Sequence, residues 1–262
     1  MSSLTTSLLV ACSDAHVPRK ENEEDQELKA LANCQHLTLN NKNLTDLKKL
    51  HLCPNTRIIH AFDNKLTDIG ALAQARTITA AYLHNNLIAS IPGDLGTHMK
   101  HLTRLYLNRN RISLFRGWAG VHGAVLEELH VAGQEGEGIQ FEEASMKALS
   151  QCLKVLDVSY NNLVDLKPMQ ALRGLRSLFA DNNKLEKLAE LKAVVDRNPS
   201  LIVCSALSNP CTKGVAKLRE CRDTIVLSCT AIEVINGKDV SATERTFLRE
   251  KARRIAQAAH ST

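Results

Sequence analysis

Histidine, tyrosine, phenylalanine and acidic side chains recur at one point of a repeated sequence pattern, and they carry the most evident chemistry in the chain. In chain order, this point holds Thr38, His60, Tyr82, Tyr106, His130, Asp157, Phe179 and Ser205. Two residues further along, the same pattern holds Phe62, His84 and Asp181. Tyrosine and histidine join an apolar ring to a polar edge, which suits them to protein interfaces. Their recurrence indicates recognition of another molecule by surface contact.

The residues that could support catalysis or metal binding form no recognisable motif. His98 and His101 are close in sequence, but they have no third ligand and no acidic residue beside them. The cysteines follow no C-x-x-C spacing, so we interpret them as reduced thiols. The eight are Cys12, Cys34, Cys53, Cys152, Cys204, Cys211, Cys221 and Cys229. The sequence therefore predicts a protein that is not an enzyme and binds no metal or cofactor.

A glycine-rich segment at 134–140, QEGEGIQ, could be mistaken for a phosphate-binding loop. The order of its glycines is wrong for such a loop, and Glu135 and Glu137 would repel phosphate. We interpret it as a flexible structural insertion. Residues 141–152 have the apolar spacing of a helix, which we expect to follow it.

The elements that position these residues follow from self-similarity along the chain. The eleven-residue pattern L-x-x-L-x-L-x-x-N-x-L occurs eight times, at starts 22 to 27 residues apart, the spacing of leucine-rich repeats. It predicts an α/β solenoid, a horseshoe with parallel concave strands, short convex helices or 3₁₀ turns, and helical N- and C-terminal caps. The units span 34–44, 56–66, 78–88, 102–112, 126–136, 153–163, 175–185 and 201–211.

Each unit assigns a direction to its side chains. Along a strand the side chains alternate, so the fourth and sixth residues, such as Leu105 and Leu107, point inward and the fifth faces the open side. Three cysteines take the leucine positions of their units and are expected to fill the core. An asparagine at the ninth position can satisfy backbone groups where the chain turns inward. It recurs at Asn64, Asn86, Asn110, Asn161, Asn183 and Asn209, whereas Lys42 and Gln134 break this rule.

Composition agrees with a repeat protein. The 262 residues include 38 leucines and only nine aromatic residues of the Phe, Tyr and Trp types, so the core must be aliphatic and repetitive. A terminal repeat cannot cover its own apolar face, and both ends therefore need caps. We divide the chain into an N-terminal cap (1–33), eight repeats (34–211), and a C-terminal cap with a basic helix (212–262).

Helices are predicted in both caps. Residues 21–33 have a polar face and are expected to shield the first repeat. Two segments, 212–222 and 224–236, are expected to fold over the last one. The capping-box pattern of Ser241 and Glu244 predicts a final helix over about 242–258.

Charge and hydropathy exclude several classes of partner. A formal net charge of +5, from 33 basic and 28 acidic residues, is too small and too spread for a nucleic-acid binder. No run of about 18 apolar residues could span a bilayer, so we expect no membrane insertion. Residues 1–7 carry no positive charge, which argues against a secretory leader. With reduced cysteines, these features indicate a cytoplasmic protein.

The row of rings is the first candidate binding surface. Parallel strands lie about 4.8 Å apart, so the row from His60 to Phe179 spans roughly 24 Å, enough for a protein surface or an extended peptide. Rings that pack across strands only for stability are the alternative. We favour an interface because charged residues are mixed with the rings. The predicted surface comprises His60, Phe62, Tyr82, His84, Arg104, Tyr106, His130, Asp157, Phe179 and Asp181.

The basic end of the chain is the second candidate. A solvated helix with clustered positive charge suits an acidic surface, such as the C-terminal tails of tubulin. Basic residues also complement a helix C-terminus and keep a cap soluble, and Phe247, Leu248 and Ile255 could dock on the solenoid. Both interpretations stay open for Arg245, Arg249, Lys251, Arg253 and Arg254.

Several segments resemble known families. The 22-residue repeats and the ending TAIEVINGKDVSATER (230–245) are similar to the Sds-type leucine-rich-repeat proteins and their C-terminal cap. LTTSLL (4–9), PRKENEE (18–24), the acidic fifth-repeat insertion and ATERTFLREK (242–251) resemble the protein phosphatase 1 regulatory subunit 42 family. That resemblance implies a non-catalytic, phosphatase-associated protein of centrosomes, cilia and microtubules. We therefore expect a cytoplasmic scaffold of the cytoskeleton, at a cilium or flagellum axoneme or a centrosome.

The resemblance also implies site residues and partners. In the Sds-type regulators, acidic and aromatic residues along the concave strands hold the phosphatase catalytic subunit. The positions that match here are His60, Phe62, Tyr82, Tyr106, Asp157, Phe179 and Asp181, whereas Arg57, Arg104, Arg109 and Arg176 depart from that pattern. The chain has no linear phosphatase-docking motif, so docking would use the horseshoe surface.

The repeat and cap motifs are shared with axonemal dynein light chains. Candidate partners are therefore the phosphatase 1 catalytic subunit, tubulin and dynein. The alternative to a phosphatase regulator is a purely structural axonemal or microtubule-associated protein with no phosphatase role.

Overall fold

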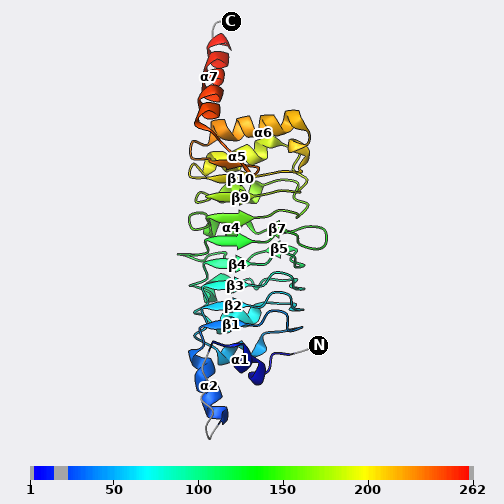
Figure 1. Cartoon of the computed structure of the whole chain (residues 1–262), viewed down its shortest axis with the longest axis vertical. Helices are drawn as coiled ribbons and strands as arrows, with labels where there is room; N and C mark the ends of the chain where they lie inside the picture. Colours follow the sequence, from blue (N-terminus) through cyan, green and yellow to red (C-terminus); the bar gives the residue numbers. More distant parts are fainter. Residues whose placement is uncertain (1–2, 15–22, 260–262) are drawn as a thin grey trace.

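The computed structural model describes residues 3–14 and 23–259 of the chain. Within them, ten short strands stack side by side in one sheet that runs the length of the solenoid (Figure 1). Its neighbouring strands are parallel, except that β12 (Lys238–Asp239) pairs antiparallel with β11 (Val234–Ile235). The eight repeats each supply one strand: β1 (His36–Thr38), β2 (Ile58–His60), β3 (Ala80–Tyr82), β4 (Arg104–Tyr106), β6 (Glu128–His130), β8 (Val155–Asp157), β9 (Ser177–Phe179) and β10 (Val203–Ser205).

Side chains alternate across these strands as the pattern predicts. The central residue of every repeat strand is buried, and so is the residue two positions later, as Leu105 and Leu107 illustrate. Cys34, Cys204 and Cys211 are buried at the leucine positions they occupy, so their predicted role as core residues is confirmed. The core is thus a stack of aliphatic layers, one from each repeat.

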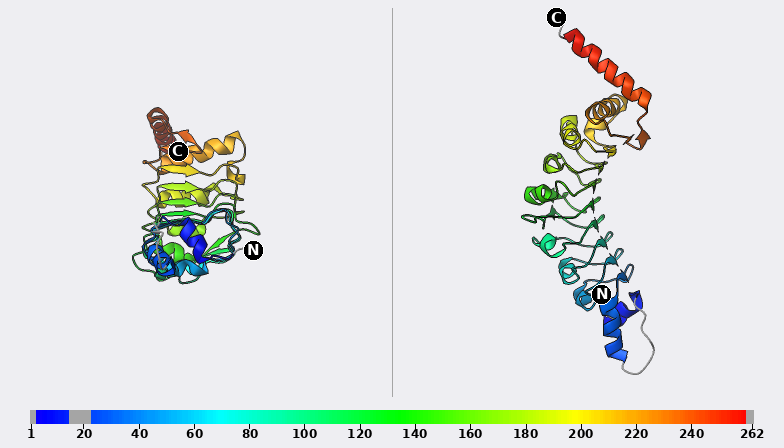
Figure 2. Two further views of the ribbon diagram at one scale, coloured as in Figure 1. Left: turned by 60° about the horizontal axis from the view of Figure 1, so that its bottom comes forward. Right: turned by 90° about the vertical axis from the view of Figure 1, so that its left-hand side faces the viewer.

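Short helices and 3₁₀ turns lie on the convex side, opposite the strands (Figure 2). The shortness of these elements lets repeats of 22 residues return to the sheet within a few turns. They are η1 (Lys48–Leu52), η2 (Gly70–Gln74), α3 (Leu95–His98), α4 (Glu143–Ala148), η3 (Lys167–Ala171), α5 (Leu188–Arg197) and η4 (Pro210–Thr212).

The fifth repeat differs from the prediction. The predicted helix over 141–152 is limited to α4, because Gln140 and Phe141 form a strand instead. This strand, β7 (Gln140–Phe141), pairs in parallel with β5 (Leu114–Phe115) in a second, two-stranded sheet beside the main one (Figure 1). The segment before β7 is therefore attached to the solenoid at its end.

A ladder of side-chain amides joins neighbouring repeats, and Gln134 belongs to it. The prediction that Gln134 breaks the rule is wrong: its Oε1 accepts from the Ile112 N–H at 3.0 Å, and its Nε2 donates to the Leu107 carbonyl at 2.9 Å. Glutamine carries the same amide as asparagine on a side chain one methylene longer, which the extended fifth repeat accommodates. Lys42 has no amide, and its own N–H donates to Asn64 Oδ1.

The N-terminal cap contains α1 (Thr6–Cys12) and α2 (Glu23–Asn33). The sequence predicted α2 but not α1, a helix that begins at the capping side chain of Thr5 and buries Leu9. Ser13 then bridges to the first strand of the sheet, which ties this cap to the repeats. Residues 21 and 22, at the start of the predicted helix, lie outside the described residues.

The C-terminal cap departs from the two predicted segments. A single helix, α6 (Val215–Ser228), crosses the predicted break at residue 223, and β11 then adds a further parallel strand to β10. The last helix, α7 (Ala242–Ala259), begins at the predicted capping box, where Ser241 Oγ accepts from the Glu244 N–H. It projects away from the repeats (Figure 2). No helix in the described part of the chain is long and apolar enough to cross a bilayer.

Candidate functional site

The parallel register places the fifth residues of neighbouring repeats directly beside one another on the concave side. His60 pairs with Tyr82, Tyr82 with Tyr106, and Tyr106 with His130. Their rings stack with centroids 4.6, 4.7 and 4.3 Å apart and planes inclined by 6°, 21° and 6°. We call these four residues the ring stack.

Stacking changes what a partner would contact. The faces of the inner rings cover one another, so the ring stack presents mainly ring edges to the concave side, including Tyr hydroxyls and His ring nitrogens. The cross-strand packing considered above is therefore present. It does not remove the surface, because all four residues stay half-buried rather than buried. The result is a rigid ridge of polar and positively polarised edges.

The strand register places the predicted row from His60 to Phe179 side by side, with Asp157 between His130 and Phe179. The stacking of rings ends at Asp157, so only the first four residues of the row form the ring stack. His130 Nδ1 lies 3.8 Å from Asp157 Oδ2, and the Ser159 N–H donates to Asp157 Oδ1. Burial alone would raise the pKa of Asp157, but the hydrogen bonds from His130 and Ser159 lower it below its ordinary value. Phe179 lies beyond this carboxylate, separate from the stacked rings. Three strand gaps of about 4.8 Å give a stack of roughly 14 Å.

Glu128 is a site residue that the sequence reasoning missed. The Tyr106 hydroxyl donates to Glu128 Oε2 at 2.7 Å. Burial, the hydrogen bond and the negative charge of Glu128 together raise the pKa of Tyr106. The signal was available, because Glu128 precedes His130 by two residues and so faces the same side of the strand.

A shorter second row lies beside the first. Phe62 and His84 stack with centroids 4.5 Å apart, and His60 meets Phe62 edge to face at 6.2 Å. Burial lowers the pKa values of His60 and His84. Both imidazoles are therefore neutral at neutral pH and add no positive charge to the surface.

The charged residues of the predicted surface fall into two groups. Asp181 Oδ1 accepts from Ser205 Oγ and from the Leu207 N–H, both at 2.6 Å, so this carboxylate joins two repeats. Arg104 and Arg109 are exposed beside the rings and keep their guanidinium groups available to a partner. The concave surface thus combines exposed positive charge with carboxylates that the fold already uses.

The side chains of His130, Asp157 and Ser159 are not arranged as a catalytic triad. Asp157 interacts with both His130 and Ser159, so its carboxylate lies between the imidazole and the hydroxyl. In a catalytic triad the imidazole lies between the carboxylate and the serine hydroxyl that it activates. On the convex side, His98 Nε2 lies 3.2 Å from Asp94 Oδ2, which corrects the expectation that it has no acidic neighbour. Across residues 3–14 and 23–259, no three histidine, cysteine or acidic side chains are grouped as a metal site.

The five basic residues of α7 do not act as one cluster. The Arg245 guanidinium donates to the carbonyls of Cys229 and Ile232, so it anchors the helix to the cap. At 100° per residue, Arg249 and Arg253 share one side of the helix, whereas Lys251 and Arg254 point elsewhere. Leu248 is buried against the cap, while Phe247 and Ile255 are exposed. For Arg245 these bonds favour the capping interpretation, while both interpretations stay open for the other four bases.

Comparisons with known proteins bear on the fold. No protein-family model matches the chain. The human leucine-rich repeats and immunoglobulin-like domains protein 1 is 27% identical over 132 residues, which are 50% of this chain and 12% of that protein. A leucine-rich-repeat protein of Leptospira interrogans superposes with a TM-score of 0.61 at 22% identity, over 79% of this chain and 50% of that one.

An internalin C2 of Listeria monocytogenes gives a TM-score of 0.59 at 20% identity, over 79% of this chain and 82% of that one. The chain has the leucine-rich-repeat fold. The predicted α/β horseshoe is thereby confirmed. Leucine-rich-repeat solenoids present extended concave surfaces for binding, which is the side where the ring stack lies. The chain matches only part of the length of the human and Leptospira proteins, so the similarity describes the fold alone.

Proposed function

We propose that this leucine-rich-repeat protein is a non-catalytic scaffold that binds a protein partner on its concave side. The ring stack carries this proposal, because it presents half-buried aromatic edges on the concave side, next to the exposed Arg104 and Arg109. Aromatic and arginine side chains dominate the energetics of protein interfaces. A rigid ridge also loses little conformational entropy on binding.

Within that role, we propose a phosphatase 1 regulatory or targeting subunit in a ciliary or centrosomal microtubule assembly. Its support is the resemblance of the repeats, the insertion and the C-terminal cap to the regulatory subunit families. Aromatic and acidic residues at the matching concave positions, such as Tyr82, Tyr106 and Asp157, are consistent with it. This proposal implies a cytoplasmic location on the cytoskeleton, at the axoneme or the centrosome.

The test is direct binding of the phosphatase 1 catalytic subunit, with its activity measured in parallel. We expect the double variant Tyr82→Ala, Phe179→Ala to lose more than 2 kcal/mol of binding free energy, about a 30-fold rise in Kd. Tyr82→Phe keeps a ring in the stack and should lose less. Tyr160→Ala is the matched control, because Tyr160 is 62% exposed and lies outside the ring stack.

Circular dichroism must show that each variant keeps the wild-type fold. Unchanged affinity of the folded double variant would contradict a concave binding site. Failure of the wild-type protein to bind or inhibit the phosphatase would contradict the regulatory role but not the scaffold.

A purely structural axonemal or microtubule role, like that of a dynein light chain, is the second candidate. The observation that favours it is α7, which projects beyond the cap with Arg249, Lys251, Arg253 and Arg254 exposed (Figure 2). Such a helix suits the acidic tails of tubulin through attraction that salt screens. Co-sedimentation with microtubules at low and high salt tests this, using a chain that lacks residues 249–262. Equal binding of the truncated and whole proteins at low salt would limit α7 to a capping role.

A further inference from the structure

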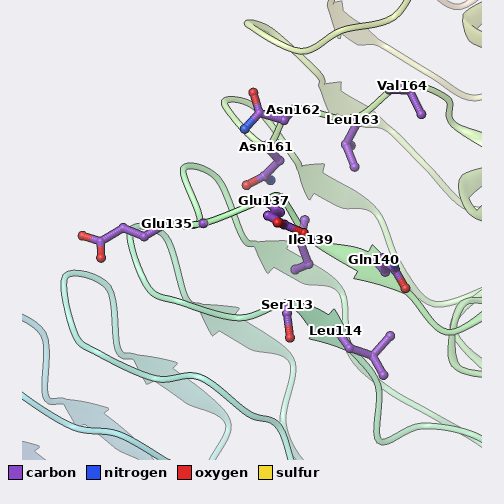
Figure 3. A pocket seen from close by; sticks show the side chains of 12 residues that line it. Ser113, Leu114, Glu135, Glu137, Ile139, Gln140, Asn161, Asn162, Leu163 and Val164 are labelled. Atoms are coloured by element: carbon purple, nitrogen blue, oxygen red, sulfur yellow. The ribbon is translucent and has the colours of Figure 1, made fainter.

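A groove lies beside the main sheet, where the fifth and sixth repeats meet (Figure 3). Its larger part has a volume of about 640 Å³ and is lined by Ser113, Leu114 and the segments 135–140 and 161–164. A smaller part of about 230 Å³ continues past Phe141 and shares Ile139, Gln140, Leu163 and Val164 with the first. The two parts form one elongated groove, separate from the ring stack.

The groove exists because the fifth repeat is longer than its neighbours. On the concave side the amide ladder stays closed: the Gln134 N–H donates to Asn161 Oδ1 at 2.9 Å. On the outer side, a regular backbone bond runs from the tenth residue of one repeat to the eleventh of the previous one, as from Lys184 to Leu163. Among the backbone bonds of the described residues, none joins Asn162 to the fifth repeat in this way. The outer layer therefore opens while the inner layer holds.

The wall of the groove at 135–138, part of the insertion that the sequence predicted, is anchored at its end. Gly138 has φ +114°, and a Cβ at this residue would lie 2.6 Å from the Asn161 carbonyl oxygen. The backbone of Gly138 thus packs directly on the sixth repeat, at a distance that only glycine permits. This contact fixes where β7 begins.

One edge of β7 faces the groove unpaired. The Gln140 N–H donates to the Ser113 carbonyl just before β5 at 2.8 Å, and the Glu142 N–H donates to the Phe115 carbonyl of β5 at 2.9 Å. Backbone groups alternate in direction along a strand, so those of Ile139 and Phe141 point away from β5 and toward the sixth repeat. In the part of the chain that the structure describes, no backbone bond connects them to residues 163–165. An unpaired strand edge is a template for an added strand.

The lining selects the chemistry of an occupant. Val164 is 67% exposed and lies with Leu163 across the groove from Leu114 (Figure 3). The charged residues among the described lining are all acidic. Glu135 is paired with Arg111 and extends away from the groove, and Asp165 lies 3.4 Å from the Lys167 ammonium, whereas Glu137 has no basic partner among the described residues (Figure 3). Complementary charge therefore requires a basic occupant.

We propose that this groove binds an extended basic segment of a partner protein, which adds as a third strand beside β7. Its backbone pairs with the free N–H and C=O groups of Ile139 and Phe141. Its apolar side chains contact Leu163 and Val164, and a lysine or arginine approaches Glu137. Main-chain pairing supplies affinity in this mode, and the side-chain contacts supply specificity.

The experiment measures fluorescence anisotropy of labelled hexapeptides with the full chain. The probe alternates lysine and valine, and a second peptide alternates glutamate and valine. We expect the lysine peptide to bind about tenfold more tightly, and N-methylation of its alternate backbone amides to weaken it about tenfold. Val164→Arg and Glu137→Lys should each weaken it about tenfold.

Val215→Arg is the matched control, because Val215 is 87% exposed on α6, away from the groove. This variant should bind the lysine peptide like the wild type, as should the Tyr82→Ala, Phe179→Ala protein with its altered concave side. The proposal is overturned by no binding of the lysine peptide at about 1 mM, by equal binding of the two peptides, or by full binding to folded Val164→Arg.

Discussion

The amide ladder predicts a ranking of two substitutions that burial alone would not give. Asn110 and Asn183 are both buried, occupy the same repeat position and lie inside the solenoid rather than at its ends. Replacement of each by leucine removes one amide of the same size. Effects of side-chain volume and transfer therefore largely cancel in the comparison. The difference should report the backbone groups that each amide satisfies alone.

Loss of the Asn110 amide leaves one N–H group without a partner. Asn110 Oδ1 accepts from the Ile88 N–H at 3.0 Å. The buried carbonyls that accept from Asn110 Nδ2 still accept from the amides of the neighbouring rungs, Asn86 and Gln134. One unsatisfied buried N–H costs about 1–3 kcal/mol, so Asn110→Leu should lower the free energy of unfolding by about that amount.

Loss of the Asn183 amide leaves two N–H groups without a partner. Asn183 Oδ1 accepts from the N–H groups of Asn161 and Leu163, both at 3.0 Å. The buried carbonyls of Val158 and Ala180, which accept from its Nδ2, keep bonds from Asn161 and Asn209. The Leu163 N–H is only partly buried and Leu163 lines the groove, so water can replace part of this second bond. Asn183→Leu should therefore be the more destabilising substitution, by about 1 kcal/mol.

Urea unfolding followed by circular dichroism measures both values, provided that the slopes of the two variants agree. Hydrogen exchange at the amides of Ile88 and Leu163 checks the assignment to individual groups. Equal destabilisation, or a larger effect of Asn110→Leu, would refute this reasoning. It holds that each buried carbonyl of the ladder accepts from two neighbouring amides, whereas each backbone N–H group has a single amide oxygen as its acceptor.

Two further predictions concern stability. Burial lowers the pKa values of His60 and His84, so the folded state favours their neutral forms. The unfolded chain takes up protons below about pH 6.5, and the stability of the folded state should fall as the pH drops below that value. The melting temperature should therefore decrease between about pH 7.5 and pH 5.5, and a variant with phenylalanine at both positions should decrease less; equal decreases would contradict the stacking argument. Gly138→Ala should lower the free energy of unfolding by about 1–3 kcal/mol in urea, because the new Cβ would lie 2.6 Å from a backbone oxygen. Gly136→Ala, with φ +109° and open space around it, is the control for backbone strain alone, and an equal loss at both glycines would show that the contact carries no cost.

The repeat pattern alone determined where the strands lie, which residues enter the core and which face the open side. Leu105 and Leu107 illustrate why: the alternation of side chains along a strand is local, and a leucine that recurs every 22 to 27 residues must be buried by the same residue of the next repeat. The capping box of α7 is local in the same sense, since Ser241 and the residue that it caps are three positions apart.

Tertiary structure alone determined how these faces combine. Whether Tyr82 and Tyr106 expose their faces or stack depends on the separation and register of two strands 24 residues apart, and that geometry leaves only edges to a partner. The groove beside β7 depends on how the lengthened fifth repeat meets the sixth. Gln134 and Asn161 hold one side closed, and the missing bond at Asn162 opens the other. Such features arise from contacts between distant segments, which no local sequence pattern encodes.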